Sequence, residues 1–327
     1  MDFEDFIAGK DDNDRKIDRV LKSIFKENKS VNVFEILRKN LVKINGSKAR
    51  KNQVVKTNDK ISVPSFLLEN RIPLSDFKSD SAAEREKYKL ETLFKNKNLW
   101  IINKPSGINV QPSEKSSQSI SNIVLLQWKN SPESRNSLSF TPAPLHRLDK
   151  LTSGVLSISQ SLDGARWFSQ EMKNHNISKK YLGVIQGILK EKVHWTDKIS
   201  KNNYTENFYT VHKSTILDKN ENSMSSSTYA TPLFYGKWKG ISFTLAEFNI
   251  ETGRKHQIRL HSSANGFPFL GDTAYGGIKG PFFLHAASLV FPENNLGVPE
   301  KVNAPLPEAF YDFLKINLLN WNGEIII

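Results

Sequence analysis

The order of hydrophobic patterns in the second part of the chain constrains the fold more than any other feature of the sequence. Short runs of apolar residues, alternating with polar residues in 155–159, predict strands at residues 99–102, 155–159, 180–186, 227–235 and 241–250. Apolar residues at helical spacing mark residues 120–128, 162–176 and 256–265. These strands and helices follow no regular β-α repeat. The pattern predicts an α+β domain, with a mixed, mainly antiparallel sheet and flanking helices.

A smaller α-β unit with its own pattern precedes this domain. Helical and then alternating spacing predict two short helices and a hairpin, at 17–24, 33–37, 41–44 and 61–63. Asn32 or Ser30 could cap the second helix, and Asn45-Gly46 is a typical hairpin turn. We therefore expect a compact helix-helix-hairpin domain over residues 15–64.

The positive charge of the chain is concentrated in this small domain. Between Arg15 and Pro64, 14 Lys or Arg residues stand against 4 Asp or Glu, so the stretch supplies ten of the twelve net charges. From charge alone, a solvated surface and a nucleic-acid-binding face are equally compatible with the sequence. A domain of about 50 residues has a marginal core, which favours a surface that serves a ligand.

The remaining boundaries follow from composition. Residues 1–14 are acidic and lack periodicity, which predicts a flexible tail. Residues 65–86 are polar and interrupted by Pro73, which predicts a linker, and the large domain is expected over 87–327. No run of about 18 apolar residues and no secretory signal is present, so we expect a cytoplasmic protein with no membrane partner.

The sequence contains no cysteine, which excludes disulfides, thiolate zinc sites and a cysteine nucleophile. His256 and His261 are five residues apart, a spacing that places them on different faces of either a strand or a helix. Together with His285, they are interpreted as structural histidines. We expect no metal and no organic cofactor.

The segment that carries the chemistry is His146-Arg147-Leu148-Asp149-Lys150-Leu151-Thr152-Ser153-Gly154. A carboxylate in such a turn is usually only a capped loop. However, the segment matches the HRLDxxTSG signature and so resembles the RluA-type pseudouridine synthases. Three further segments match the same family in the same order: Asn103-Lys104-Pro105-Ser106-Gly107, Lys179-Lys180-Tyr181 and Thr252-Gly253-Arg254-Lys255-His256-Gln257-Ile258-Arg259. Gly271-Asp272-Thr273-Ala274-Tyr275-Gly276 and Leu284-His285-Ala286 extend the resemblance over residues 90–292.

The resemblance implies a role for each of the matched residues. Asp149 is the catalytic carboxylate, which stabilises or attacks the ribose when the glycosidic bond of uridine breaks. Arg254 is the expected cation beside Asp149, with Arg259 as the alternative. Tyr181 is expected to pack against the uracil and to assist removal of the C5 proton. Arg147 is expected to enter the space that the flipped nucleotide leaves.

The basic N-terminal unit is similar to an S4 RNA-binding domain, which some members of the family carry ahead of the catalytic domain. This order of domains and the HRLD form imply RNA as the partner, and 23S-type large-subunit ribosomal RNA before transfer RNA. Arg38, Lys39 and Lys51 are the candidate RNA contacts of the unit. No obligatory protein partner is implied. Lys150-Leu151 and Gln111 differ from the residues that are common in the family at these positions. Because residues around the catalytic loop contact the substrate, the resemblance does not identify which uridine is modified.

Two alternative functions remain at this point. A non-catalytic RNA-binding or ribosome assembly factor could retain the same motifs as structure. A glycosidase or base-excising hydrolase would ordinarily need a second carboxylate, for which Asp163 and Asp272 are the nearest candidates. Asp163 is expected at a helix start and Asp272 in a turn.

Overall fold

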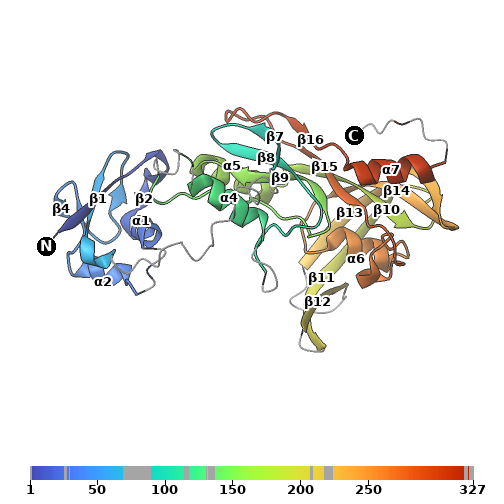
Figure 1. Ribbon diagram of the computed structural model, residues 1–327, viewed down its shortest axis with the longest axis horizontal. Coiled ribbons are helices and arrows are strands. Elements are labelled where there is room, and N and C mark those ends of the chain that lie inside the picture. The colour runs from blue at the N-terminus through green and yellow to red at the C-terminus, as the bar shows by residue number, and fades with distance from the viewer. Residues whose placement is uncertain are drawn as a thin grey trace, which may run out of the picture. The chain divides into compact units, whose positions relative to one another are not determined.

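The computed structural model describes residues 2–25, 28, 30–68, 90–113, 118–129, 131, 137–206, 209–216, 224–319 and 323 (Figure 1). The chain divides into two compact units. The first comprises Met1–Lys89, Ser121–Ala143 and Ser159–Arg166, and the second comprises Leu90–Ile120, Pro144–Ile158 and Trp167–Ile327. The division near residue 90 lies close to the expected start of the large domain at 87, but the first unit also includes two later segments.

The N-terminal unit is built on a small antiparallel sheet and two helices. The sheet has the strand order β1-β6-β3-β4, and a separate pair joins β2 to β5. The elements are β1 (Phe3–Ile7), η1 (Lys10–Asp12), β2 (Arg15–Lys16), α1 (Ile17–Ile24), α2 (Val33–Arg38), β3 (Lys43–Ile44), β4 (Ser47–Lys48), β5 (Val54–Val55), β6 (Lys60–Pro64) and η2 (Ser65–Leu67). The two predicted helices are thus confirmed, and the predicted hairpin forms part of a larger sheet.

Local sequence signals explain these elements. The Asn32 carboxamide oxygen accepts hydrogen bonds from the backbone N–H groups of Phe34 and Glu35, so the expected cap of α2 is present. Asn45 and Gly46 both have positive φ angles, 49° and 79°, as the tight turn between β3 and β4 requires. The apolar faces of α1 and α2 pack with Val42, Val55, Ile61 and Val63 in one buried core.

The expectation of a flexible tail at residues 1–14 is wrong. Residues Phe3–Ile7 form β1, which pairs with β6 in antiparallel register. Phe6 packs against the core, and Asp5 forms an ion pair with Lys60 at 2.6 Å. The acidic charge of the segment suggested a tail, whereas its apolar residues place it in the sheet. The acidic residues of this segment also reduce the net positive charge of the unit.

Two aspartates connect the N-terminal segment to later parts of the same unit. Asp12 is fully buried, and its carboxylate accepts hydrogen bonds from the backbone N–H groups of Leu138 and Ser139, at 2.8 and 2.9 Å. Asp11 accepts a 2.8 Å hydrogen bond from the N–H group of Leu162, where α5 (Leu162–Lys173) begins. A carboxylate at a helix N-terminus is favourable because unpaired N–H groups lie there. The expected linker lies outside the described residues from residue 69 onward.

The second unit contains one large sheet, and the α+β fold class is as predicted. The strand order is β12-β11-β13-β14-β10-β15-β9-β8-β7, with β16 paired to β15. β15 and β9 run parallel, whereas the other recorded pairs are antiparallel. The strands are β7 (Glu91–Lys95), β8 (Leu99–Lys104), β9 (Ser153–Ser159), β10 (Ser178–Gln186), β11 (Val193–Glu206), β12 (Tyr209–Ile216), β13 (Met224–Trp238), β14 (Ile241–Ile250), β15 (Leu284–Val290) and β16 (Lys301–Asn303). The five predicted strands are confirmed.

Helices complete this architecture, as Figure 1 shows. In the second unit they are the later part of α5, α6 (Gln257–Ala264), the short η5 (Thr273–Tyr275) and α7 (Glu308–Asn317), whereas α4 (Ile120–Lys129) lies almost entirely in the first unit. Phe310 and Leu314 of α7 pack in a core with Leu182 of β10 and Leu245 of β14. Since neighbouring residues of a strand face opposite sides, Tyr181 lies on the other face of β10 from Leu182.

The described part of the chain contains no helix with the length and apolar character that a membrane crossing requires.

Candidate active site

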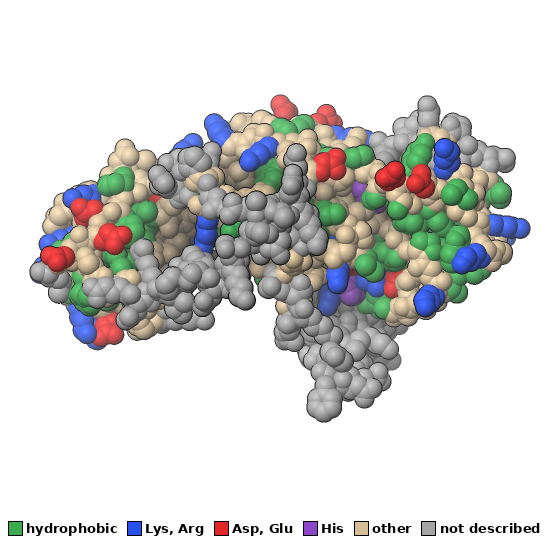
Figure 2. Space-filling model, viewed as in Figure 1, with side chains coloured by type: hydrophobic (Ala, Val, Ile, Leu, Met, Phe, Trp, Pro, Cys, Tyr) green, Lys and Arg blue, Asp and Glu red, His purple; other side chains and the backbone are tan. Residues whose placement is uncertain are grey.

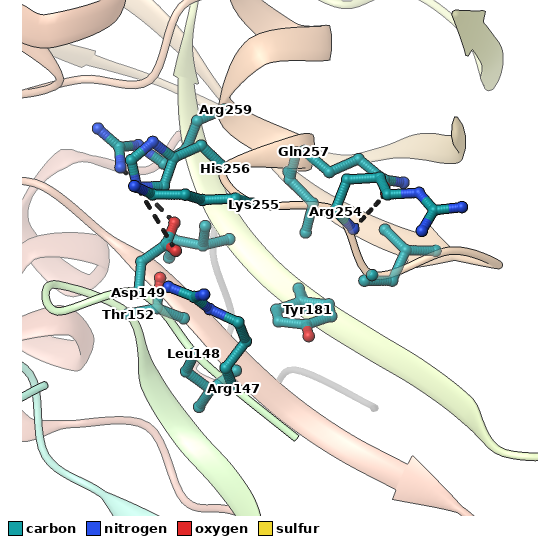
Figure 3. A pocket seen from close by; sticks show the side chains of 14 residues that line it. Arg147, Leu148, Asp149, Thr152, Tyr181, Arg254, Lys255, His256, Gln257 and Arg259 are labelled. Atoms are coloured by element: carbon teal, nitrogen blue, oxygen red, sulfur yellow. Dashed lines mark hydrogen bonds and ion pairs between the residues drawn. The ribbon is translucent and has the colours of Figure 1, made fainter. Parts of the chain in front are cut away.

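A pocket in the second unit brings together the segments that the sequence singled out. Its walls come from the loop before β9, from β10, from the end of β14, from the loop and first turn of α6, and from β15. The open cavity measures about 470 Å³. Among its lining residues, Asp149 is the one carboxylate, whereas Arg147, Arg254, Lys255 and Arg259 are cationic (Figure 3). A pocket with this excess of positive charge suits part of a polyanion.

The turn after β8 holds the Asp149 loop in place. The backbone N–H of Gly107 donates to the carbonyl of Lys150 at 2.8 Å, and the Ser106 hydroxyl donates to the carbonyl of Leu151 at 2.7 Å. Lys104 is fully buried, and its ammonium group donates to the same Lys150 carbonyl at 3.3 Å. Burial lowers the pKa of Lys104 to about 7, although the nearby Asp149 charge opposes this shift. The Asn103–Gly107 motif therefore supports the loop from behind.

The other end of the loop is fixed where β9 and β15 run parallel. His285 is fully buried; its Nε2 lies 3.2 Å from the Ala304 carbonyl oxygen, and its Nδ1 lies 2.9 Å from the Ser153 hydroxyl. Burial lowers the pKa of His285 to about 4, so the ring is neutral near pH 7. The structure thus agrees with a structural role for His285. Gly154 has a φ of 110°, and a Cβ there would clash with the Ala286 carbonyl oxygen.

His146 supports the loop from its beginning. Its Nε2 accepts a hydrogen bond from the backbone N–H of Ser157 at 3.0 Å, and its ring stacks on Phe168 at a centroid distance of 5.7 Å. Burial, reinforced by the Lys179 charge, lowers the pKa of His146 to about 3. Only a neutral imidazole has a ring nitrogen that can accept a hydrogen bond from a backbone N–H.

Two side chains of the α6 region face the carboxylate of Asp149 (Figure 3). Nη1 of Arg259 lies 3.6 Å from Oδ2, and Nε2 of His256 lies 3.6 Å from Oδ1. Arg259 is also bound by Asp272 through two hydrogen bonds of 2.6 and 2.7 Å. Its guanidinium carbon lies 4.7 Å from the ring centroid of Tyr275. Asp149 therefore has an oriented cation on one oxygen and an imidazole on the other.

The expectation that Arg254 is the cation beside Asp149 is corrected by this geometry. Arg254 precedes α6 and its Nε donates to the Ser225 carbonyl at 3.3 Å, while Figure 3 shows its guanidinium directed away from Asp149. His256 and Arg259 are three residues apart at the start of the helix and therefore share a face. The sequence motif contains both arginines, and only the phase of the helix distinguishes them.

Gln257 fixes the loop that carries Arg254. Its side-chain oxygen accepts hydrogen bonds from the Arg254 backbone N–H and the Thr252 hydroxyl, at 3.0 and 2.7 Å. Its side-chain nitrogen donates to Ser227 and Thr228 of β13, each at 2.9 Å. Gln257 is 3% exposed, so this network is shielded from water.

Tyr181 contributes an aromatic wall at the centre of the sheet. It is 7% exposed and lies between Phe248 of β14 and Ala286 of β15. The register with β15 shifts at Lys180/Tyr181, so the strand is irregular at this residue. Burial, together with the nearby Asp149 charge, raises the pKa of the Tyr181 hydroxyl well above its ordinary value. The side chain therefore enters the pocket as an uncharged phenol.

The structure brings three of the predicted catalytic and RNA-binding residues, Arg147, Asp149 and Tyr181, into one pocket with Arg254 on its wall. Arg147 is exposed and extends beside Asp149 in Figure 3. His256 was not predicted as a site residue, because its spacing from His261 was considered only for metal binding. Asp272 was considered only as a turn residue and as a candidate second carboxylate, and Tyr275 only as part of a motif. No group of three metal-ligating residues occurs among the described residues.

The other predicted RNA contacts lie on the N-terminal unit. Arg38, Lys39 and Lys51 are exposed. Lys39 forms a 2.6 Å ion pair with Glu35, and the ammonium of Lys51 lies 5.9 Å from the ring of Phe34, which is 50% exposed. In the view of Figure 2, basic and acidic side chains are interspersed on this unit. The surface thus combines cations with an exposed aromatic ring.

Several known proteins resemble the chain in sequence. Residues 98–264 match the family described as RNA pseudouridylate synthase. A ribosomal large subunit pseudouridine synthase C of Rickettsia conorii is 30% identical over 305 residues, which cover 90% of this chain and 95% of the relative. An uncharacterised RNA pseudouridine synthase of Bacillus subtilis is 26% identical over 95% of this chain and 97% of the relative. A tRNA pseudouridine synthase C of Haemophilus ducreyi is 29% identical over 57% of this chain and 74% of the relative.

A solved structure has a similar fold. The human RNA pseudouridylate synthase domain containing 4 superposes with a TM-score of 0.54 and 23% sequence identity, covering 69% of this chain and 92% of that chain.

Proposed function

The chain belongs to the RNA pseudouridylate synthase family, and we propose that it isomerises specific uridines of large-subunit ribosomal RNA with Asp149 as its catalytic carboxylate. The observation that carries the assignment of Asp149 is its place as the one carboxylate among the residues that line the pocket, opposite Arg259 and near Tyr181. Isomerisation breaks the bond between uracil N1 and ribose C1′, turns the uracil and joins C5 to C1′. Each of these steps needs a group that the pocket offers.

Asp149 acts on the sugar in this proposal. Cleavage of a glycosidic bond builds positive charge on the ribose, which a nearby carboxylate stabilises or traps by attack. Arg259, being bound by Asp272, presents its charge to the carboxylate in one orientation. Water must be kept away from the detached sugar, because water would turn isomerisation into hydrolysis.

Tyr181, Arg147 and Arg254 act on the nucleotide. The buried ring of Tyr181 offers a flat surface for a uracil that has left its stack, and its protonated hydroxyl is placed to assist transfer of the C5 proton. Arg147 is exposed beside Asp149, where it can fill the position of the flipped nucleotide. We assign Arg254 to RNA contact at the pocket wall and no longer to the pair with Asp149.

A hydrolase is less consistent with this site. A glycosidase places two carboxyl groups about 5–10 Å apart on either side of the scissile bond. Asp272 is 4% exposed and both of its oxygens are bound by Arg259, so it is not free to act as an acid. Asp163 lies in the first turn of α5 and does not line the pocket.

Large-subunit ribosomal RNA is the preferred substrate on two grounds. The relatives from Rickettsia conorii, Rickettsia typhi and Buchnera aphidicola that match about nine-tenths of this chain are named for the ribosomal large subunit. The relative named for tRNA matches 57% of the chain. The N-terminal unit, which we propose is an S4-like RNA-binding domain, would add affinity through Arg38, Lys39 and Lys51. Such a substrate would place the protein in the cytoplasm.

The substrate proposal is tested with tritium release from transcripts labelled at uracil C5. Fragments of 23S-type ribosomal RNA and a set of tRNA transcripts are compared at the same concentration. Release from ribosomal RNA alone is expected. Release from tRNA alone would overturn the ribosomal assignment, and binding of ribosomal RNA without release from any transcript would favour the non-catalytic assembly factor.

A further inference from the structure

We propose that Tyr275 and His256 form a positioning pair for Asp149, in which the Tyr275 hydroxyl donates to Nδ1 and so supports the Nε2–H tautomer of His256, the form in which the imidazole presents a donor to the carboxylate. The inference rests on the proposed function of Asp149. It concerns two residues outside the set formed by Asp149, Tyr181 and Arg259.

The backbone of His256 is held in an unusual conformation. His256 is the N-cap residue of α6, with φ 57° and ψ 20°, in the left-handed region that non-glycine residues rarely adopt. Its side chain makes no capping hydrogen bond to the helix. Instead, the ring is directed at Asp149, with Nε2 at 3.6 Å from Oδ1 (Figure 3). Strained residues of this kind cluster at functional sites, because the surrounding structure must hold them.

Tyr275 holds the other side of the same ring. Its hydroxyl lies 2.6 Å from His256 Nδ1, and the two rings meet edge to face at a centroid distance of 5.6 Å. Tyr275 is itself fixed, because its carbonyl accepts a 2.6 Å hydrogen bond from Ser263 of α6 and its N–H donates to the Asp272 carbonyl at 3.0 Å. The contact therefore joins α6 and η5 around His256.

The hydrogen positions follow from the partners. Burial lowers the pKa of His256 to about 4; the Asp149 and Asp272 charges oppose this shift, whereas Arg259 and Lys255 add to it. Near pH 7 the ring is neutral and carries one N–H. An ionised carboxylate can only accept, so the N–H belongs on Nε2, which faces Asp149. Nδ1 then accepts from the Tyr275 hydroxyl, which burial keeps protonated by raising its pKa.

This arrangement gives each Asp149 oxygen its own partner. Arg259 faces Oδ2 and His256 faces Oδ1, both at 3.6 Å, which exceeds an ordinary hydrogen bond. Catalytic hydrogen bonds are often long without substrate and shorten when it binds. With both contacts closed, the plane of the carboxylate is fixed relative to the ribose. Without the Nε2–H, a lone pair of the imidazole would face the carboxylate and repel it.

The tautomer is measured by ¹⁵N NMR on protein labelled at its seven histidines, with His256→Gln to assign the signals. We expect Nε2 of His256 to be protonated and Nδ1 unprotonated at pH 7. Tyr275→Phe keeps the ring beneath Arg259 and removes only the hydroxyl, so it should give a mixture of tautomers. A protonated Nδ1 in the wild type, or an unchanged spectrum in Tyr275→Phe, overturns the proposal. This measurement does not depend on catalysis.

Single-turnover isomerisation then tests the positioning role. Glutamine places its amide nitrogen near the position of Nε2, whereas asparagine reaches only the position of Nδ1. Asparagine tolerates the left-handed backbone best, so backbone strain cannot explain a loss in His256→Asn. His256→Asn is expected to be slower than His256→Gln by about tenfold, the equivalent of one hydrogen bond to a charged group. Equal rates for the two variants would contradict the proposal.

A double-mutant comparison separates tautomer control from packing. Tyr275→Phe should slow the His256 enzyme by about threefold to tenfold, and should change the His256→Gln enzyme by less than about twofold, because an amide has no tautomer to fix. An equal loss in both backgrounds would assign Tyr275 a purely structural role. If the wild type released no tritium from any RNA, the proposed function would fall, and the NMR result would still decide the tautomer.

Discussion

Arg259 binds Asp272 through two nitrogens and directs a third toward Asp149. Nε and Nη2 lie 2.6 and 2.7 Å from the two oxygens of Asp272, and Nη1 lies 3.6 Å from Oδ2 of Asp149. Asp272 is 4% exposed, so its charge depends on the guanidinium for compensation. The position of the cation beside Asp149 is therefore set by a second carboxylate that does not line the pocket.

Replacing Asp272 with Asn is expected to slow isomerisation more than it weakens RNA binding. The amide keeps the shape of the side chain but can accept only one of the two hydrogen bonds from Arg259. A rate loss of about tenfold to a hundredfold corresponds to one charge-assisted hydrogen bond. Single-turnover rates and filter binding measure the two effects. Asp163→Asn, at an exposed position of α5, is the matched control, and an equal rate loss in both variants would contradict the role of Asp272.

Arg259 and Arg254 are distinguished by conservative replacement. Arg259→Lys keeps a charge but loses the planar fork, so the rate at saturating RNA is expected to fall by about a hundredfold. Arg254→Lys is expected to act mainly on RNA affinity, because its guanidinium lies at the pocket wall and contacts Ser225. The rate and the half-saturating RNA concentration are measured for both variants. A rate loss confined to Arg254→Lys would restore the assignment made from the sequence.

The two arginines illustrate which part of the site could be predicted from the sequence and which part could not. The matched motifs predict that Asp149, Tyr181 and both arginines lie in one site, because these motifs together form the site in the family that the chain resembles. α6 begins at Gln257, with His256 as its N-cap. Arg259 therefore lies in the first turn, three residues after His256 and on the same face, whereas Arg254 lies in the loop before the helix. Element boundaries shift by one or two residues easily, so this choice needed coordinates.

Some strands of the fold could likewise be predicted from the sequence, whereas others could not. The strands with clear alternation, such as 241–250, were predictable, whereas β15 is buried on both sides and its residues do not alternate. β11 is long and carries many polar residues, so it gave no strand signal. The N-terminal strand β1 was missed because the acidic residues Glu4 and Asp5 within it concealed the contribution of Phe6 to the core.

The free energy of unfolding should fall on acidification, because a buried histidine such as His285 takes up a proton more readily in the unfolded state. His285 has an unfolded pKa of 6.5 and a folded pKa of about 4, so between these values the unfolded state binds the additional proton. The contribution of His285 to the free energy of unfolding is fully present above pH 6.5 and is lost as the pH falls toward 4. It amounts to at most about 3 kcal/mol.

Urea midpoints at pH 7.5 and pH 5 measure this effect. His285→Gln removes the titration, so the difference between the two midpoints should shrink in that variant. His175→Gln at an exposed position is the control and should keep the wild-type difference. An unchanged difference in His285→Gln would show that other groups dominate the acid response.

The basic surface of the N-terminal unit is tested by charge removal. Replacing Arg38, Lys39 and Lys51 with Gln should weaken RNA binding and reduce the slope of log affinity against log salt by about 2, because Lys39 is already paired with Glu35. The control replaces the exposed Lys237, Lys239 and Lys315 of the other unit, which removes the same three charges. Equal changes in slope for both triple variants would mean that net charge alone, and not this surface, binds the RNA.

The central claim is that Asp149 performs the isomerisation, and its most direct test is tritium release from ribosomal RNA labelled at uracil C5. Asp149→Asn keeps the size of the side chain and removes the carboxylate. The wild type is expected to release tritium without producing free uracil, and Asp149→Asn is expected to bind the RNA and release none. Release by Asp149→Asn at a rate near that of the wild type, or free uracil as the wild-type product, would contradict the account.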